Sequence, residues 1–143
     1  MLTHHHVLLH SGHLVEERLR QRLKPLGIQP RQARILNVLN VLGQASQADL
    51  ARRFNVTAAS MSTMTCRLIK AGFIAREPGP AELRTNSLTL TDSGRDMLDA
   101  IHEAWDDVDR VIEEAIGPEQ AKALGELTLA LRDALGGRAP ADL

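Results

Sequence analysis

The side chains best suited to recognition chemistry lie in one stretch of the sequence, residues 46–72, and in a loop that follows it. Hydroxyl groups and small side chains gather near the start of a predicted helix between Thr57 and Gly72, and Arg67 and Lys70 lie near its end. Small side chains let a helix backbone approach base edges, hydroxyls bond to bases or phosphates, and basic groups bind phosphates. This pattern indicates binding to nucleic acid. The candidate DNA-binding residues are Ser46, Gln47, Thr57, Ala59, Ser60, Ser62, Thr63, Arg67, Lys70 and Arg84.

Two predicted helices joined by a tight turn position these residues. Ser46 is a good N-cap for the first helix, with Asp49 placed to complete a capping box, and Asn55 suits the left-handed position that ends it. Thr57 caps the second helix. Its inward face has the spacing i, i+3, i+4, i+7 and comprises Met61, Met64, Thr65 and Leu68. The arrangement predicts a helix-turn-helix with a recognition helix, and an ordinary helical hairpin with a polar outer face is the alternative.

An apolar helix is predicted before this pair, from Pro30 to Gly43, because proline is favoured in the first helical turn and glycine after the last. Its periodic stripe supplies a third helix for the helix-turn-helix core. The residues expected to be buried on it are Ile35, Leu36, Val38, Leu39, Val41 and Leu42.

Two β-prone runs follow the predicted recognition helix, over residues 73–76 and 87–91. The polar loop between them contains Pro78, Gly79 and Pro80. Two short strands joined by such a loop predict a β-hairpin wing. Arg84 lies near its tip, where a guanidinium can enter a minor groove. The alternative is an ordinary loop arginine in water.

The composition favours a mainly helical protein of one structural domain. The chain has 143 residues with 43% hydrophobic and 24% charged content, but only 2% aromatic residues. Such a length can bury a sizeable core, and a core of Leu, Ile, Val, Met and Ala favours helices over a β-sandwich. The single cysteine excludes an internal disulfide framework. With no signal peptide or transmembrane run in the sequence, we expect a cytoplasmic protein.

The net charge of −1 conceals an uneven distribution along the chain. Residues 1–95 contain 13 Lys and Arg against six Asp and Glu, whereas residues 96–143 contain four against 12. A basic part of this size can face a phosphate backbone while the acidic part lies away from it. Uneven surface charge without function is the plainer explanation.

The two ends of the chain are predicted to form the remaining helices. An amphipathic helix extends to about Lys24, a long helix capped by Asp92 extends to about Ala115, and a last helix ends at Gly136–Gly137. The last helix is richer in leucine than one hairpin can bury, which suggests a partner; packing on the chain's own first helix is the alternative. We therefore divide the chain into an N-terminal dimerisation helix (1–29), a winged helix-turn-helix (30–95) and C-terminal dimerisation helices (96–143).

These motifs together resemble the MarR family of winged-helix transcriptional regulators over residues 26–98. The runs that carry the resemblance are LGIQPRQARILNVL, then SQADLARRFNVTAASMSTMTCRLIKAGFIAR, and the closing LTDSGRDML. The resemblance implies a homodimer, formed through the first and the last two helices, that binds a palindromic operator on double-stranded DNA. It also implies repression, and release by a small ligand.

The chain departs from the family pattern at the recognition helix and the wing. The family often has Arg or Lys where Thr63 stands and Asp where Cys66 stands. Near the wing tip it usually has Asp-Arg-Arg or Asp-Lys-Arg, where this chain has Glu82, Leu83 and Arg84. Because Cys66 has no carboxylate, an ion pair from the helix to Arg84 is not available here.

An effector pocket is expected between the first helix, the Pro30 helix and the long helix. A ligand there can weaken operator binding only if its affinity differs between dimer conformations that hold the two winged regions at different distances. The candidate lining residues are His13, Arg34, Asn37, His102 and Trp105.

The sequence also allows other function classes. The N-terminal histidines include His6 and His10 at helical spacing, but no acidic or thiol ligand accompanies them, so a solvated run is favoured over a metal site. Oxidation of Cys66 on the DNA-facing side is a redox alternative. A winged helix that binds protein rather than DNA is another. We expect no enzyme, cofactor or metal, because no catalytic constellation is present in the sequence.

Overall fold

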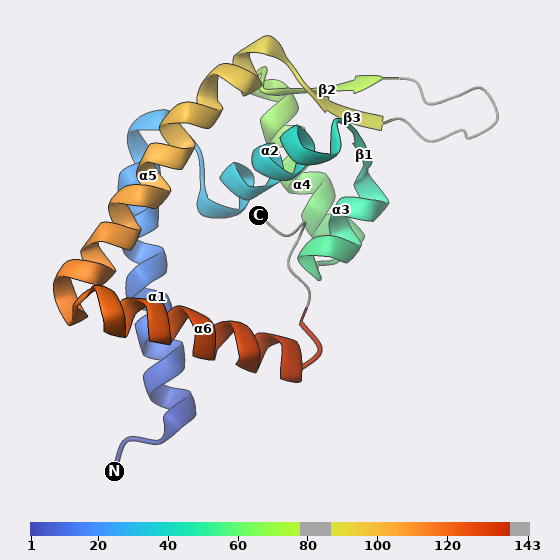
Figure 1. The fold of residues 1–143 in the computed structure, drawn as a ribbon. Helices are drawn as coiled ribbons and strands as arrows, with labels where there is room; N and C mark the ends of the chain where they lie inside the picture. Colours follow the sequence, from blue (N-terminus) through green and yellow to red (C-terminus); the bar gives the residue numbers. More distant parts are fainter. Residues whose placement is uncertain (78–86, 138–143) are drawn as a thin grey trace.

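The fold is mainly helical, with a small sheet beside the helix-turn-helix (Figure 1). The structure is a computed structural model, and it describes residues 1–77 and 87–137. The predicted arrangement, a winged helix-turn-helix with additional terminal helices, is confirmed. In chain order the elements are α1 (His4–Leu23), the 3-10 helix η1 (Lys24–Leu26), α2 (Pro30–Leu42), β1 (Ala45–Ser46), α3 (Gln47–Phe54), α4 (Ala58–Lys70), β2 (Ile74–Glu77), β3 (Ser87–Leu90), α5 (Asp92–Ile116) and α6 (Pro118–Ala134).

The sheet has the order β1-β3-β2, with both pairs antiparallel. The pair β2 and β3 is the predicted wing, in the register Ile74↔Leu90 to Glu77↔Ser87. The predicted tip, with Arg84, lies outside the described residues. The two-residue strand β1 was not predicted, because strands this short carry no periodic signal. Its pairing of Ala45 with Leu88 joins the start of α3 to the wing.

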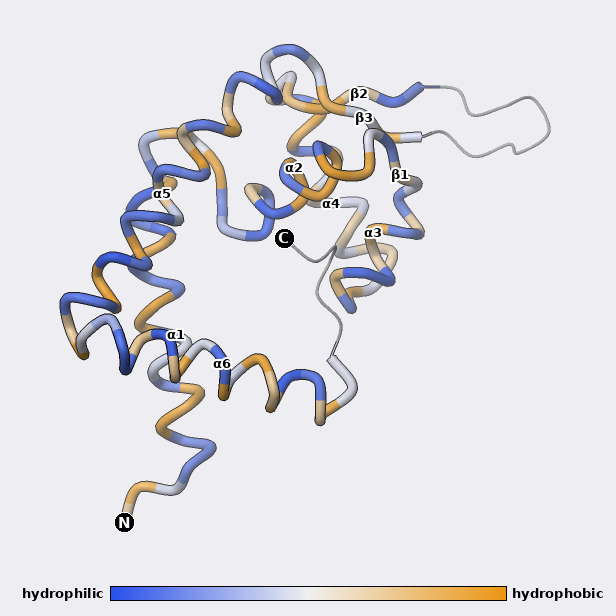
Figure 2. Tube along the Cα trace, in the orientation of Figure 1, coloured by the Kyte–Doolittle hydropathy of each residue, from blue (hydrophilic) through white to orange (hydrophobic). Residues whose placement is uncertain are grey.

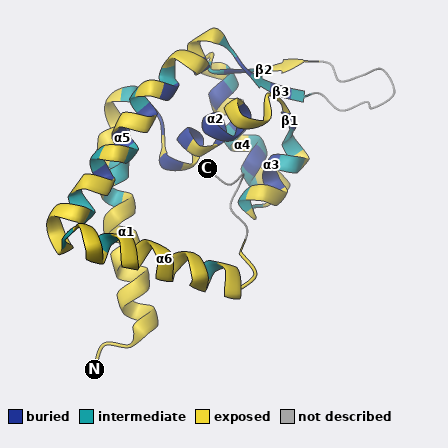
Figure 3. Cartoon of the chain, viewed as in Figure 1, coloured by how far each residue is buried: buried dark blue, intermediate teal, exposed yellow. Residues whose placement is uncertain are grey.

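The core lies where α2 meets the other elements of the winged helix and α5 (Figure 3). Leu36, Leu50, Leu88 and Ile101 are fully buried and come from α2, α3, β3 and α5. The prediction for α2 was wrong at its last turn, where Val41 is 55% exposed and Leu42 is 38% exposed. The buried residues of α2 come from its earlier turns. The apolar stripe of α2 therefore continues past the part of the helix that other elements of the protomer cover.

Most of the predicted helix caps are confirmed. The Ser46 hydroxyl accepts from the Asp49 backbone N–H, and Asn55 has the left-handed φ of 51°. The predicted cap of α5 was wrong by one residue, since Thr91, not Asp92, is the N-cap. The Thr91 hydroxyl accepts from the Gly94 N–H at 3.1 Å and donates to the Gly72 carbonyl at 2.6 Å. A carboxylate at this position has no proton to donate.

The terminal helices form a separate arm of the molecule (Figure 1). Helix α1 packs against α5, and α6 turns back from the end of α5 and packs against it. A groove of about 650 Å³ lies between these three helices, lined by apolar residues such as Leu8, Ile112 and Leu124. Within the described ranges, no helix has both the length and the apolarity needed to cross a bilayer.

Candidate nucleic-acid interface

Helix α4 is positioned as a recognition helix should be, with one face in the core and one in solvent. The inward set is confirmed: Met61, Thr65 and Leu68 are buried and Met64 is partly buried. On the other face the structure leaves Ser60 and Ser62 half-buried. The fully exposed members of that face are Ala59, Thr63, Cys66, Arg67 and Lys70. This exposed face has no acidic side chain, and two of its members are cations.

The hydroxyls near this face differ in what they can still donate. Ser46 and Thr57 accept backbone N–H groups, from Asp49 and Ser60 respectively, so each keeps its own O–H for a phosphate. Thr63 differs, because its hydroxyl donates to the Ala59 carbonyl at 3.1 Å within the same helix. Ser46 and Thr57 are therefore the better hydroxyl donors for an anionic backbone, and Thr63 retains only acceptor capacity.

A hydrogen-bond cluster, buried only at Thr65, ties the start of α3 to α4 and to the wing. The Thr65 hydroxyl lies 2.9 Å from the Met61 carbonyl in its own helix and 3.1 Å from the Gln47 side-chain oxygen, so its single proton is shared between these acceptors. The Gln47 oxygen also accepts from the Arg76 guanidinium at 3.2 Å. The sequence places Gln47 only among possible DNA contacts, and Arg76 only at the end of a strand. A buried threonine on the inward face of a helix was the available signal, because a buried hydroxyl needs a partner. The cluster fixes the angle between the helix pair and the wing.

We expect Thr65→Val to lower the free energy of unfolding by about 1 kcal/mol, as for a typical lost hydrogen bond. The side chain is fully buried, so shape is kept while the donor to Gln47 is removed. Urea denaturation measures the loss. Thr63→Val on the exposed face of the same helix is the matched control and should stay within about 0.5 kcal/mol of the parent. Equal stabilities of the two variants would contradict the role given to the cluster.

The predicted effector residues do not form one site. His102 Nε2 lies 2.8 Å from the Asn37 side-chain oxygen, and the rings of His102 and Trp105 are 5.4 Å apart. Arg34 and Trp105 line a cavity of about 310 Å³ between α1, α2 and α5, whose other walls include Val15 and Leu19. His13 is exposed on α1 and does not line this cavity. Four of the five residues are therefore near one another, in two adjoining groups.

The N-terminal histidines are exposed along the first turns of α1. His5 and His6 lie close, with ring centroids 4.1 Å apart, and both are within hydrogen-bond distance of the Thr3 hydroxyl. In the part of the chain that the structure describes, no group of three or more His, Cys, Asp or Glu side chains is placed to hold a metal ion.

Comparison with known proteins supports the family resemblance. Residues 28–85 match the MarR family. A comparison with curated proteins finds no significant match. Among solved structures, the apo form of wild-type MarR from E. coli is similar at a TM-score of 0.79 and 18% identity, covering 92% of this chain and 98% of that one.

Two further similar structures contain DNA. The transcriptional repressor CouR bound to a 23-mer DNA duplex has a TM-score of 0.84 at 21% identity and covers 90% of this chain and 92% of that one. A mutant MarR from E. coli complexed with operator DNA has a TM-score of 0.77 at 21% identity and covers 87% and 90% of the two chains. The fold and the exposed helix face define a winged helix-turn-helix protein. Within this class, residues 28–85 match the MarR family, and the chain shares the fold of the similar solved structures.

Proposed function

We propose that this protein is a ligand-responsive DNA-binding transcriptional regulator that represses genes by binding a palindromic operator as a homodimer. The observation that carries the proposal is the acid-free, exposed face of α4 beside a wing, in a chain whose residues 28–85 match the MarR family. In this proposal α4 enters a major groove, Ser46 and Thr57 donate to phosphates, and Arg84 at the wing reaches an adjacent minor groove. The place of action is the cytoplasm, and the role is recognition rather than catalysis.

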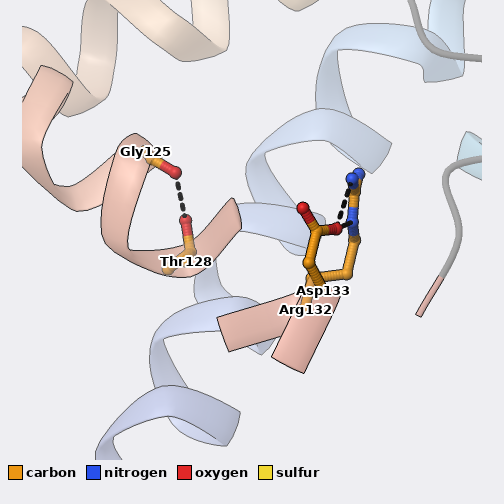
Figure 4. Close-up of polar contacts among 4 residues, drawn as sticks. All are labelled: Gly125, Thr128, Arg132 and Asp133. Atoms are coloured by element: carbon orange, nitrogen blue, oxygen red, sulfur yellow. Dashed lines mark hydrogen bonds and ion pairs between the residues drawn. The ribbon is translucent and has the colours of Figure 1, made fainter. Parts of the chain in front are cut away.

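The proposed dimer rests on the exposed apolar face of the terminal helices, visible as apolar segments along α6 and α1 (Figure 2). Every residue of α6 is at least partly exposed in the protomer. Its polar contacts are internal: the Thr128 hydroxyl shares its proton between the Leu124 and Gly125 carbonyls, and Arg132 pairs with Asp133 (Figure 4). A second copy covering this face would place two α4 helices about one helical turn of DNA apart, roughly 34–36 Å. We therefore assign residues 1–29 and 96–143 to dimerisation and residues 30–95 to DNA binding.

The proposed effector site is the 310 Å³ cavity between α1, α2 and α5. Arg34 supplies a cation at its wall, and Trp105 supplies an aromatic surface. Asp109 supplies an acidic group at the same wall, so the lining suits a small aromatic ligand whose polar group pairs with Arg34 or Asp109. Because α2 belongs to the winged helix and α1 and α5 to the terminal arm, a ligand there can bias the angle between the two parts.

Replacing Arg67 and Lys70 with glutamine should weaken operator binding about tenfold or more at moderate salt. Both side chains are exposed on α4, so the change removes phosphate contacts without disturbing the core. The plot of log affinity against log salt should lose about two units of slope, one for each lost phosphate contact. Fluorescence anisotropy on a palindromic duplex selected from random sequences measures both quantities.

The control for this variant is Arg18→Gln with Lys24→Gln, which removes the same charge from exposed positions on α1 and η1. It should leave the salt slope unchanged. Operator affinity that is independent of salt in the parent protein, or that falls equally in both variants, would reject the proposed interface.

A further inference from the structure

A second basic site lies away from the exposed face of α4. An open cavity of about 480 Å³ lies between the start of α2, the end of α3 and the backbone at Gly136 and Gly137. Four arginines line it, and we call them the arginine site: Arg31, Arg34, Arg52 and Arg53. Arg31 and Arg34 lie on α2, and Arg52 and Arg53 lie on α3, at least 18 residues away in the sequence. The fold, not the local sequence, therefore brings them together.

Within the described residues, carboxylates compensate little of the positive charge of the arginine site. Arg52 pairs with Asp49, whereas Arg31, Arg34 and Arg53 form no ion pair or side-chain hydrogen bond within residues 1–77 and 87–137. Among the eight described arginines outside the site, Arg18, Arg67 and Arg76 form no ion pair. The other five pair with carboxylates, namely Arg20, Arg22, Arg95, Arg110 and Arg132.

Helix polarity adds to the imbalance at one side of the cavity. Helix α2 begins at Pro30 and has no acidic residue in its first turn. Arg31 therefore places a cation at the positive end of a helix dipole, where an anion is the favoured neighbour. The guanidinium groups of the arginine site repel one another, and an anion bound between them would reduce this repulsion.

We propose that the arginine site binds a small organic anion that carries two or more negative charges on phosphate or carboxylate groups. Guanidinium groups bind both kinds of oxyanion through paired N–H donors. The lining is completed by Phe54, which offers an aromatic surface for an apolar body, and by Asn55. Gly136 and Gly137 bring no side chain into the space. The cavity volume accommodates a metabolite-sized molecule.

The arginine site differs in place from both sites already described. It lies at the C-terminal end of α3, whereas the proposed phosphate donor Ser46 caps the opposite end of that helix. The cavity with Trp105 lies between α1, α2 and α5, and of the residues that the structure describes Arg34 alone lines both cavities. Anion binding is thus a property that can be measured on the protein without DNA, and its failure leaves the proposed function untouched.

The test is isothermal titration of the full-length protein with sodium pyrophosphate and, separately, with sodium citrate, at matched ionic strength. The variant Arg31→Gln with Arg53→Gln is chosen because Arg34 also lines the other cavity and Arg52 is already paired. Both changed residues are exposed, so the fold should be kept, which circular dichroism checks. We expect saturable binding of at least one probe by the parent, weakened about tenfold or more in the variant.

The control Arg18→Gln with Lys24→Gln removes equal charge outside the cavity and should bind the probe as the parent does. Binding lost equally in both variants would show a general charge effect and overturn the proposal. The absence of saturable binding of either probe to the parent would also overturn it. If neither probe binds but the Arg31→Gln, Arg53→Gln variant has a lower affinity than the parent for a non-specific duplex, these arginines would instead contact DNA phosphates.

Discussion

Replacing Leu127 and Leu131 with glutamate should separate the proposed dimer into monomers and weaken operator binding at least about 100-fold. These side chains lie four residues apart on α6 and are 69% and 42% exposed in the protomer. If a second copy covers them, each glutamate must bury a carboxylate in an apolar interface, which costs several kcal/mol per unpaired charge. Because they are exposed in the protomer, the folded subunit itself should survive.

The effect on DNA binding follows from the loss of linkage between two recognition helices. In the dimer, binding of one half-site places the second helix at a high effective concentration over the other. A monomer retains the α4 face and its basic side chains but binds each half-site independently. Operator affinity should therefore fall steeply, while weak non-specific binding to duplex DNA should change little.

Light scattering after size exclusion gives the mass of each variant, and anisotropy gives its operator affinity. Val41→Glu is the matched control for oligomeric state, since Val41 is 55% exposed and lies on α2, away from α6. It should remain dimeric. A parent protein that is monomeric at working concentration, or a double variant that remains dimeric, would remove α6 from the proposed interface.

Much of the winged helix could be predicted because its signals are local. The Ser46 and Thr57 side chains each accept the backbone N–H of the residue three positions later. Asn55 ends α3 because asparagine tolerates the left-handed backbone conformation. Two β-prone runs and the turn-forming loop between them were enough to predict β2 and β3. In each case the residues that determine the structure are near neighbours in the sequence.

The features that were missed depend on residues distant in sequence. Gln47 meets Thr65 and Arg76 only after α3, α4 and the wing have packed together. Thr91 caps α5 in preference to Asp92 because the Gly72 carbonyl lies within reach of its hydroxyl. The four members of the arginine site likewise come from α2 and α3. Periodicity within one helix carries no information about such contacts.

The site residues show the same division. Exposure of Ala59, Arg67 and Lys70 follows from the period of one helix, so the sequence could predict that face. The effector group required the relative placement of α1, α2 and α5. Asn37 and His102 meet across α2 and α5, but His13 on α1 does not share the cavity that Arg34 and Trp105 line.

Gly94→Ala should be the most damaging single substitution among the glycines of the winged helix. A Cβ built at Gly94 would lie 2.0 Å from the backbone oxygen of Phe73 and 3.2 Å from a Leu90 methyl carbon. A backbone atom is held by its own hydrogen bonds, and the Phe73 carbonyl accepts from the Thr91 N–H at 3.1 Å. The clash can be relieved only by moving the start of α5 away from the sheet.

We expect this substitution to lower the free energy of unfolding by about 3 kcal/mol or more, at the upper end of what overpacking costs. In a chain of this length the midpoint of thermal unfolding should fall by about 10 °C. Ser93→Ala, one residue earlier and exposed, should change stability by less than about 0.5 kcal/mol. Thermal and urea denaturation of the three proteins give the comparison.

The consequence for function comes from what this contact joins. Phe73 follows α4 and leads into the wing, while Gly94 begins the helix that carries the proposed dimerisation arm. Close approach of the two backbones holds the recognition helix at a fixed angle to that arm. If Gly94→Ala remains folded at low temperature, its operator affinity should still fall, because the two α4 helices no longer match the half-site spacing. Parent-like stability and affinity together would show that neither the fold nor the spacing depends on this joint.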